Sequence, residues 1–404
     1  MLNILISLIV PFLIWGPFFP DLIVSSSSII FLIYIFRNKK FNFLNKKPII
    51  IFFIFCIYIL LVSIFVAKEI LISLESSLFY FRIGIFACLI WYLIEKDKSI
   101  LNNFYYFLII SFSALVIDGY YQFFVGYNIF GLPLYSERVS SFFGDELIMG
   151  SYLSRLFPLL FAIFVVRKSN NFEKYFISIL FILIDILIYI SGERTAFFFL
   201  NLSTLFIIIF IKKFQKLRLI TFIVSFFLIT LITLNNVNIK NRMVNDTYKN
   251  MSSSIFSEGH ENFIKTAFNM FKDKPFFGHG PKMFRVMCND QKYAVGLDPC
   301  TTHPHNFYIQ LLAETGFIGF MFLLISLLYV IYCSIRQLKT IIYRKERFLN
   351  DYQVCLLGSI LITVWPLSPN GNFFNNWLAI CYSLPIGFYL HSVYGANKNR
   401  INKI

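Results

Sequence analysis

Residues 49–67 read IIIFFIFCIYILLVSIFVA, an apolar run without a charged side chain. A helix of roughly 20 such residues spans the hydrocarbon core of a bilayer. Lipid offers no water to satisfy backbone N–H and C=O groups, so a helix is the structure open to such a run. The stretch therefore predicts a transmembrane helix.

Comparable runs recur along the whole chain. Of its 404 residues, 58% are apolar and 14% are charged, whereas a soluble domain carries about 25% charged residues. This composition excludes a water-soluble protein and predicts an all-α polytopic membrane protein with about twelve transmembrane helices. The predicted segments are 2–18, 21–36, 49–67, 70–94, 101–125, 147–166, 175–190, 196–211, 219–235, 316–335, 353–366 and 374–391.

The distribution of basic residues predicts the topology. The net charge is +15, which in a soluble protein would suggest nucleic acid as a partner. Here most cations lie in alternate short connections, so they mark cytoplasmic loops and no nucleic-acid partner is expected. Examples are Arg37, Lys47, Lys96, Arg167, Lys213, Arg218 and Arg344. Both termini are then cytoplasmic.

Three parts of the chain follow from this topology. Residues 1–235 form nine transmembrane helices, and residues 316–404 form three more with a cytoplasmic tail. The connection 236–315 lies outside, because long loops translocate largely regardless of their charge. It is the one extramembrane region large enough to hold a site.

Five ionisable residues fall inside the predicted spans. They are Glu75, Arg82, Asp118, Arg155 and Asp185. Such residues are costly in lipid and usually face the interior of a bundle. Because four of them lie at a similar depth and Arg82 lies deeper, we expect a polar cavity that opens outward. The alternative is simple pairing that fixes helix packing.

Arg194 lies at the predicted outer start of a helix, in the sequence Ser-Gly-Glu-Arg-Thr at 191–195. Free N–H groups at a helix N-terminus and a guanidinium together suit an anion. Arginine is also the side chain best shaped to hold phosphate oxygens in pairs. The alternative is an Arg194 that pairs with Glu193 or with a lipid headgroup.

The outer connection holds four of the five histidines, His260, His279, His303 and His305. Asn306 can cap a helix that presents Gln310 and Glu314 on one face and ends at Gly316. A histidine at that helix entrance can accept a proton from an attacking hydroxyl. The alternatives are a structural His305, or a metal site with Cys300, whose spacing matches no standard zinc pattern.

Two of the seven cysteines, Cys288 and Cys300, lie in the outer connection. Compartments outside the cytoplasm favour disulfides, so we expect these two to be joined. The other five, which lie in or near the predicted spans, are expected to be buried small apolar residues.

The sequence His303-Pro304-His305-Asn306, followed by Leu-Leu-Ala-Glu-Thr-Gly at 311–316, resembles the signature of the O-antigen ligase and polymerase superfamily. The sequence Pro-Phe-Phe-Gly-His-Gly at 275–280 is similar to a second block of that family, and Ser-Gly-Glu-Arg at 191–194 to a first. The resemblance implies a GT-C-like fold of about twelve helices with one large periplasmic loop. It also implies a multi-pass protein of the bacterial inner membrane with its site facing the periplasm.

The resemblance further implies a glycosyltransferase. Its donor would be a glycan linked to undecaprenyl pyrophosphate, and its acceptor a hydroxyl of lipid A-core or of another glycan. Arg194 would hold the pyrophosphate and His305 would be the base, with no cofactor. The family often has Gly-Arg where this chain has Gly259-His260, so His260 or Arg242 takes the second phosphate contact. Further substrate-binding candidates are Arg138, His303, Asn306 and Glu314.

Other functions fit the same residues. A polymerase would extend a lipid-linked repeat, and a protein O-oligosaccharyltransferase would use a protein hydroxyl as acceptor. A membrane transporter would use the charges within the spans but would not need a histidine-rich outer loop. The motifs do not separate these acceptors.

The topology can be tested with reporter fusions. Fusions at Lys40, Lys213 and Arg344 should report a cytoplasmic location, and a fusion at Asn289 a periplasmic one. A cytoplasmic Asn289 would contradict the placement of the site.

Overall fold

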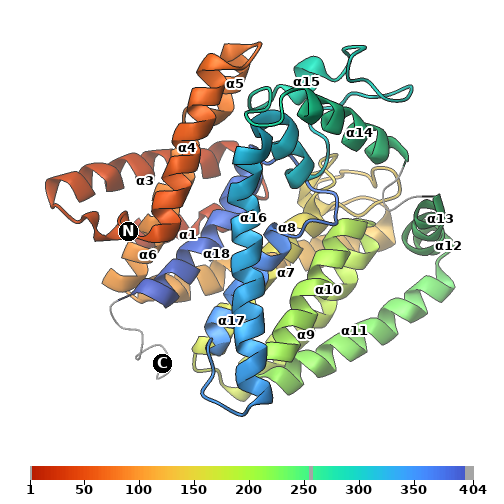
Figure 1. Ribbon diagram of the computed structural model, residues 1–404. Coiled ribbons are helices and arrows are strands. Elements are labelled where there is room, and N and C mark those ends of the chain that lie inside the picture. The colour runs from red at the N-terminus through yellow and green to blue at the C-terminus, as the bar shows by residue number, and fades with distance from the viewer. Residues whose placement is uncertain (1, 254–257, 396–404) are drawn as a thin grey trace.

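The computed structural model describes residues 2–253 and 258–395. It confirms an all-α polytopic membrane protein, with no strand among these residues (Figure 1). Seven helical segments are long and apolar enough to cross a membrane. They are α3 (Phe18–Arg37), α4 (Lys47–Phe65), α5 and α6 (Ile70–Ser77 and Phe81–Lys96), α7 (Ser99–Val125), α8 (Met149–Val166), α11 (Gln215–Asn235) and α16 (Phe307–Ile342).

The other predicted segments are also helical, but they are shorter or more polar. They correspond to α1 and α2 (Leu2–Ser7 and Ile9–Phe12), α9 (Asn171–Ile190), α10 (Arg194–Phe210), α17 (Asp351–Thr363) and α18 (Asn376–Tyr394). Twelve spans therefore remain a prediction. Two short turns of 3-10 helix, η1 (Phe41–Phe43) and η2 (Ser141–Phe143), lie in connections.

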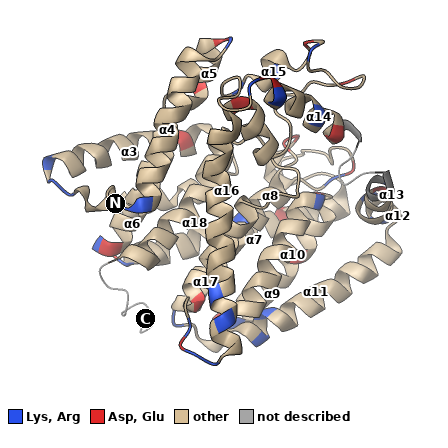
Figure 2. Cartoon of the chain, viewed as in Figure 1, with Lys and Arg blue, Asp and Glu red and all other residues tan. Residues whose placement is uncertain are grey.

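The centre of the bundle is α8. Every residue from Tyr152 to Val165 is buried, and the helix packs against α17, α10, α7 and α9. On one side of it, α6 packs against α18. By contrast α3, α4 and α11 leave much of their apolar surface exposed, as expected for helices that face lipid. Several basic residues gather around the lower end of α16, near α17, and others lie at the far end of α3 and beside the N-terminus (Figure 2).

The connection between α11 and α16 is folded. It contains α12 (Val237–Lys240), the π-helical turn η3 (Asn241–Asn245), α13 (Asp246–Ser253), α14 (Glu258–Asp273) and α15 (Phe284–Met287). Around α14 and α15 a small separate core joins Ala267, Met270, Phe284, Cys288, Tyr293 and Ala313. Because Ala313 belongs to α16, this core seats the connection on the start of that helix (Figure 1).

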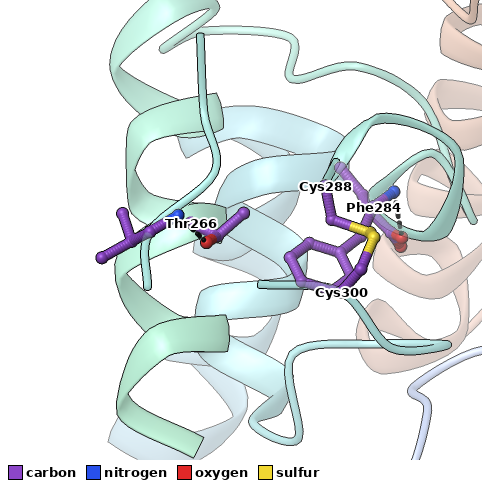
Figure 3. Close-up of a disulfide and its surroundings, with 6 residues drawn as sticks. Thr266, Phe284, Cys288 and Cys300 are labelled. Carbon is purple, nitrogen blue, oxygen red and sulfur yellow. Dashed lines mark hydrogen bonds between the residues drawn. A yellow bond between two sulfur atoms is a disulfide. The ribbon is translucent and has the colours of Figure 1, made fainter. Parts of the chain in front are cut away.

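Cys288 and Cys300 form the expected disulfide, with their Cα atoms 5.1 Å apart (Figure 3). Cys300 is therefore not available as a thiolate for the alternative metal site. Nearby, the Phe284 amide donates to the Glu314 carboxylate at 3.2 Å. The other five cysteines are free and buried, as predicted.

A break at Gly316 divides α16 into a short first part and a long span, as the sequence predicts. Gly316 has φ 64° and ψ −170°, a conformation open essentially to glycine alone. The turn after α14 lies against this break, because the Gly280 amide donates to the Glu314 carbonyl at 2.7 Å and the Phe317 amide to the Pro275 carbonyl at 2.8 Å. A Cβ atom on Gly316 would collide with the Phe276 backbone.

The charges within the spans do not line one cavity. Asp185 forms a two-pronged ion pair with Arg218, with oxygen to nitrogen distances of 2.8 and 2.9 Å. Arg218 lies in the first turn of α11 and is fully buried, so it pairs within the bundle, a contact that the sequence did not predict. The other charges have separate partners. Asp118 accepts from the Ser141 hydroxyl and the Ile129 amide, Arg82 pairs with Asp21, and Glu75 pairs with Lys282. These contacts correspond to the alternative interpretation, pairing that fixes helix packing.

The break at Gly316 yields a stability prediction. Gly316→Ala should lower the stability of the purified protein by about 1–3 kcal/mol, because alanine is strained at this φ and ψ and its Cβ meets the Phe276 backbone. Thermal unfolding in a matched detergent measures the change. Gly358→Ala in α17 is the control, because its Cβ would meet nothing nearer than 3.6 Å. Equal midpoints for the two variants would contradict the account.

Candidate functional site

The turn that carries His303 and His305 is fixed at both ends. Asn306 caps α16, and its side-chain oxygen accepts from the amides of Tyr308 and Ile309 at 3.0 and 3.2 Å. The Asn306 amide nitrogen donates to the Pro366 carbonyl at 2.8 Å. The predicted cap is thus present, and it also ties the turn to the connection between α17 and α18.

The two histidines of this turn differ in what their rings contact. Both ring nitrogens of His303 are occupied. Its Nε2 lies 3.3 Å from the Asn370 carbonyl and its Nδ1 lies 2.8 Å from the Thr302 hydroxyl. Since a carbonyl only accepts, Nε2 carries the proton and Nδ1 accepts from the hydroxyl. His303 therefore has no ring nitrogen left for a substrate.

The ring of His305 makes no hydrogen bond within the described part of the chain, and it is half-buried. It lies between two other imidazoles, with ring centroids 4.2 Å from His303 and 4.9 Å from His260. The carbonyl of His305 accepts from the Asn370 amide at 2.7 Å. Its φ of 53° is uncommon outside glycine, and such backbone strain clusters at functional sites.

Burial keeps the ring of His305 neutral. It lowers the pKa of His305 to about 4, with a smaller contribution from His260. Burial and His305 lower the pKa of His303 to about 3. At neutral pH the His305 ring therefore has an unprotonated nitrogen that can accept a proton.

Three arginines surround the turn between α9 and α10. The Arg138 Nε donates to the Ser191 carbonyl at 3.1 Å, and the Arg242 Nε donates to the Gly192 carbonyl at 3.0 Å. Arg194 is the first residue of α10 and is exposed. Gly192, with φ 69°, allows the Arg242 side chain to lie against the backbone of the turn, because a Cβ at residue 192 would lie 2.5 Å from the Arg242 Nε. Arg138, Arg194 and Arg242 are called the arginine cluster below.

No carboxylate forms an ion pair with the arginine cluster within the described residues. The nearby Glu193 is instead bound to the start of α8, where its two oxygens accept from the amides of Gly150 and Ser151 at 2.5 and 2.9 Å. Burial is the main cause that lowers the pKa of Arg138; the charge of Glu193 opposes this shift, and Arg242 and Arg194 add to it. Cations held this close without a paired anion make a site suited to a multivalent anion.

The arginine cluster adjoins the three histidines. After burial, the charge of Arg194 is the second cause that lowers the pKa of His260, and His260 contacts His305. A cavity of about 210 Å³ opens beside Gly192, lined by residues that include Tyr189, Asn241, Arg242 and Asp246. The structure therefore brings Arg194, Arg242, Arg138, His260 and His305 into one region.

Glu314 lies apart from this opening. Its side chain is fully buried and accepts from the Phe284 amide and from Gln310 Nε2, the latter at 3.0 Å. Gln310 also donates to Asn372 at 2.8 Å. These contacts favour a role for Glu314 in holding the outer connection on α16 rather than in touching a substrate.

Two asparagines that sequence reasoning missed complete the support of the site. Asn370 binds both His303 and the carbonyl of His305, and Asn372 binds Gln310. The signal was the sequence Ser-Pro-Asn-Gly-Asn at 368–372, a polar stretch between two apolar segments.

Comparison with known families confirms the resemblance. Residues 177–324 match the family model described as O-antigen ligase. This range includes Arg194, Arg242, His260 and the turn from His303 to Asn306, whereas Arg138 precedes it. No curated protein matches the chain.

The protonation of His305 gives a pH prediction. Diethyl pyrocarbonate acylates only the neutral imidazole, so labelling of His305 should persist as the pH falls and have its midpoint near the lowered pKa of about 4. A free histidine peptide in the same tube should show a midpoint of about 6.5. As the pH falls, the His305 ring takes up its proton in the unfolded chain before it does so in the folded protein. The free energy of unfolding therefore decreases as the pH drops from about 6.5 to about 4. Mass spectrometry of the peptide that contains His305 reads the result, and a midpoint near 6.5 would contradict the assignment.

Proposed function

We propose that the protein is a glycosyltransferase that moves a glycan from undecaprenyl pyrophosphate to a hydroxyl of lipid A-core at the periplasmic face of the bacterial inner membrane. The observation that carries this proposal is the arrangement of a neutral, half-buried imidazole next to arginines that form no ion pair among the described residues. The imidazole accepts a proton, and the guanidinium groups stabilise negative charge. A transfer from a lipid pyrophosphate requires both.

The arginine cluster suits the donor's pyrophosphate. Arg194 is exposed at the N-terminal end of α10, where the helix dipole also favours an anion. A guanidinium can hold two phosphate oxygens at once. As the sugar leaves, negative charge grows on the pyrophosphate, and cations already in place stabilise it without moving.

The second phosphate contact falls to Arg242. The family that the chain resembles often has an arginine where this chain has His260, and the pKa of His260 is lowered by burial and by Arg194. At neutral pH His260 is then uncharged. Arg242 is held next to the same turn through its bond to the Gly192 carbonyl, so its guanidinium remains close to that of Arg194. Arg138 adds a third cation next to Gly192.

His305 acts as the base in a single displacement. The acceptor oxygen bonds to the anomeric carbon of the first sugar while the bond from that carbon to the phosphate oxygen breaks. The hydroxyl proton passes to the His305 imidazole, and the lipid pyrophosphate leaves with both electrons of the broken bond. General-base help of this kind contributes roughly 10²–10⁴-fold. No nucleotide is consumed, because the donor bond itself supplies the free energy.

Substitutions should separate the two roles. Arg194→Ala should weaken donor binding about 10- to 100-fold, because it removes a charge-assisted contact of about 1.5–3 kcal/mol. Arg194→Lys should restore only part of the loss. His305→Ala should bind the donor normally and transfer roughly 10²–10⁴-fold more slowly. Donor binding and glycan transfer are measured side by side on purified variants of equal thermal stability.

The control is Arg336→Ala, an exposed arginine of α16 far along the chain from the site; it should change neither quantity. Near wild-type transfer by His305→Ala would show that the base assignment is wrong. Lipid A-core, a second lipid-linked repeat and a protein are offered as parallel acceptors. Product on the lipid A-core supports a ligase, whereas product on either other acceptor alone would replace that part of the proposal.

A further inference from the structure

Arg155 is a buried cation that the proposed chemistry does not use. It lies on α8, one turn beyond the amides that bind Glu193, and only 6% of its surface is exposed. Its guanidinium lies over the Phe199 ring at 5.1 Å. Within the described residues it forms no ion pair, and its Nε and Nη1 have no hydrogen-bond partner. An arginine this deep, without a carboxylate, is costly for the fold.

Among the described residues, the one hydrogen bond of Arg155 leads toward the turn that carries His303 and His305, called the histidine turn below. Its Nη2 donates to the Asn370 side-chain oxygen at 2.9 Å, in a buried contact. The backbone of Asn370 holds the turn from the same side, since its amide donates to the His305 carbonyl at 2.7 Å and its carbonyl accepts from His303 at 3.3 Å. Asn370 therefore joins Arg155 to both histidines.

The same helix also holds the turn next to the arginine cluster. Glu193 directly precedes Arg194 and accepts from the Gly150 and Ser151 amides at the start of α8. Arg155 follows Ser151 by four residues, which is one helical turn. The largely buried helix α8 thus binds the turn that carries Arg194 through Glu193, and it reaches the turn that carries His305 through Arg155 and Asn370.

We propose that Arg155 is a positioning residue, which through Asn370 sets the place of the His305 ring relative to Arg194. The consequence for catalysis rests on the proposed function, whereas the consequence for the histidine turn does not. A displacement of about 1 Å of a reacting group can cost roughly 10²-fold in rate. A buried arginine bond that fixes such a group therefore has a measurable effect although it touches no substrate.

The test uses the full-length protein and two measurements. Carbethoxylation of His303 and His305 with diethyl pyrocarbonate, followed across pH by mass spectrometry, reports the environment of the turn without any transfer assay. The groups that face these rings are His260 from α14, Asn370 from the connection between α17 and α18, and Arg285, whose charge acts on His303. The second measurement is kcat and KM for glycan transfer.

Arg155→Met should loosen the turn. The labelling midpoint of His305 should rise from about 4 toward the value of about 6.5 of an exposed histidine, and His303 should become reactive. In transfer, kcat should fall by up to roughly 10²-fold with little change in KM for the donor. Arg155→Lys should recover part of both effects, because lysine keeps one donor for Asn370.

Asn370→Ala tests the same bond between Arg155 and Asn370 if Arg155→Met does not fold. It removes the side-chain acceptor of Arg155 and leaves the backbone bonds of residue 370 in place. It should reproduce the effects of Arg155→Met. The control is Asp185→Asn combined with Arg218→Met, which removes another buried pair of the bundle and should leave the labelling unchanged.

Three results would overturn the inference. One is a folded Arg155→Met protein with wild-type labelling and kcat. Another is a raised KM for the donor with unchanged kcat, which would make Arg155 a phosphate contact. The third is an Asn370→Ala protein that labels like the wild type. If labelling responds but the wild-type protein transfers no glycan, the positioning stands and the proposed function fails.

Discussion

A polar group buried in the protein has no water to satisfy it, and the site depends on this one constraint. Every buried polar side chain must find its partner within the protein or remain unpaired at high cost. Glu193 finds two amides of α8, Asn306 finds the start of α16, and Glu314 finds Phe284 and Gln310. These forced pairings fix the turns that carry Arg194 and His305. Precision at the site therefore comes from polar contacts, while apolar packing supplies the rigid helices.

The chemical properties of the site depend on which polar groups have a partner and which do not. The carboxylate beside the arginine cluster accepts from backbone amides, and among the described residues the three cations form no ion pair. The two imidazoles of the histidine turn also differ, since both nitrogens of His303 are occupied and the His305 ring has no hydrogen bond in the described part of the chain. Burial holds the pKa of His305 at about 4, which keeps it neutral. A group of cations without an ion pair among the described residues, next to an unprotonated base, is what the proposed transfer from a pyrophosphate to a hydroxyl requires.

The sequence predicted the features that depend on local order. Apolar runs predicted the positions of the helices, and Asn306 and Gly316 predicted the cap and the break of α16. Two cysteines outside the predicted spans predicted the disulfide. It did not predict contacts between distant segments. Arg218 was assigned to a basic cytoplasmic connection, and its buried pairing with Asp185, 33 residues earlier in the chain, was not predicted. Asn370 lies 65 residues beyond His305 in the chain, and no periodicity connects the two. Spacing along the chain reports local turns, whereas pairings across the bundle depend on how helices pack.

The most direct test of the account is a structure of the protein with a lipid-linked glycan bound, determined by electron cryomicroscopy in a lipid environment. We predict that the pyrophosphate lies within hydrogen-bonding distance of Arg194 and of Arg242 or Arg138. The anomeric carbon should then face the His305 ring, with room for one hydroxyl between them. A pyrophosphate bound elsewhere, or a His305 ring turned away from the first sugar, would contradict the account.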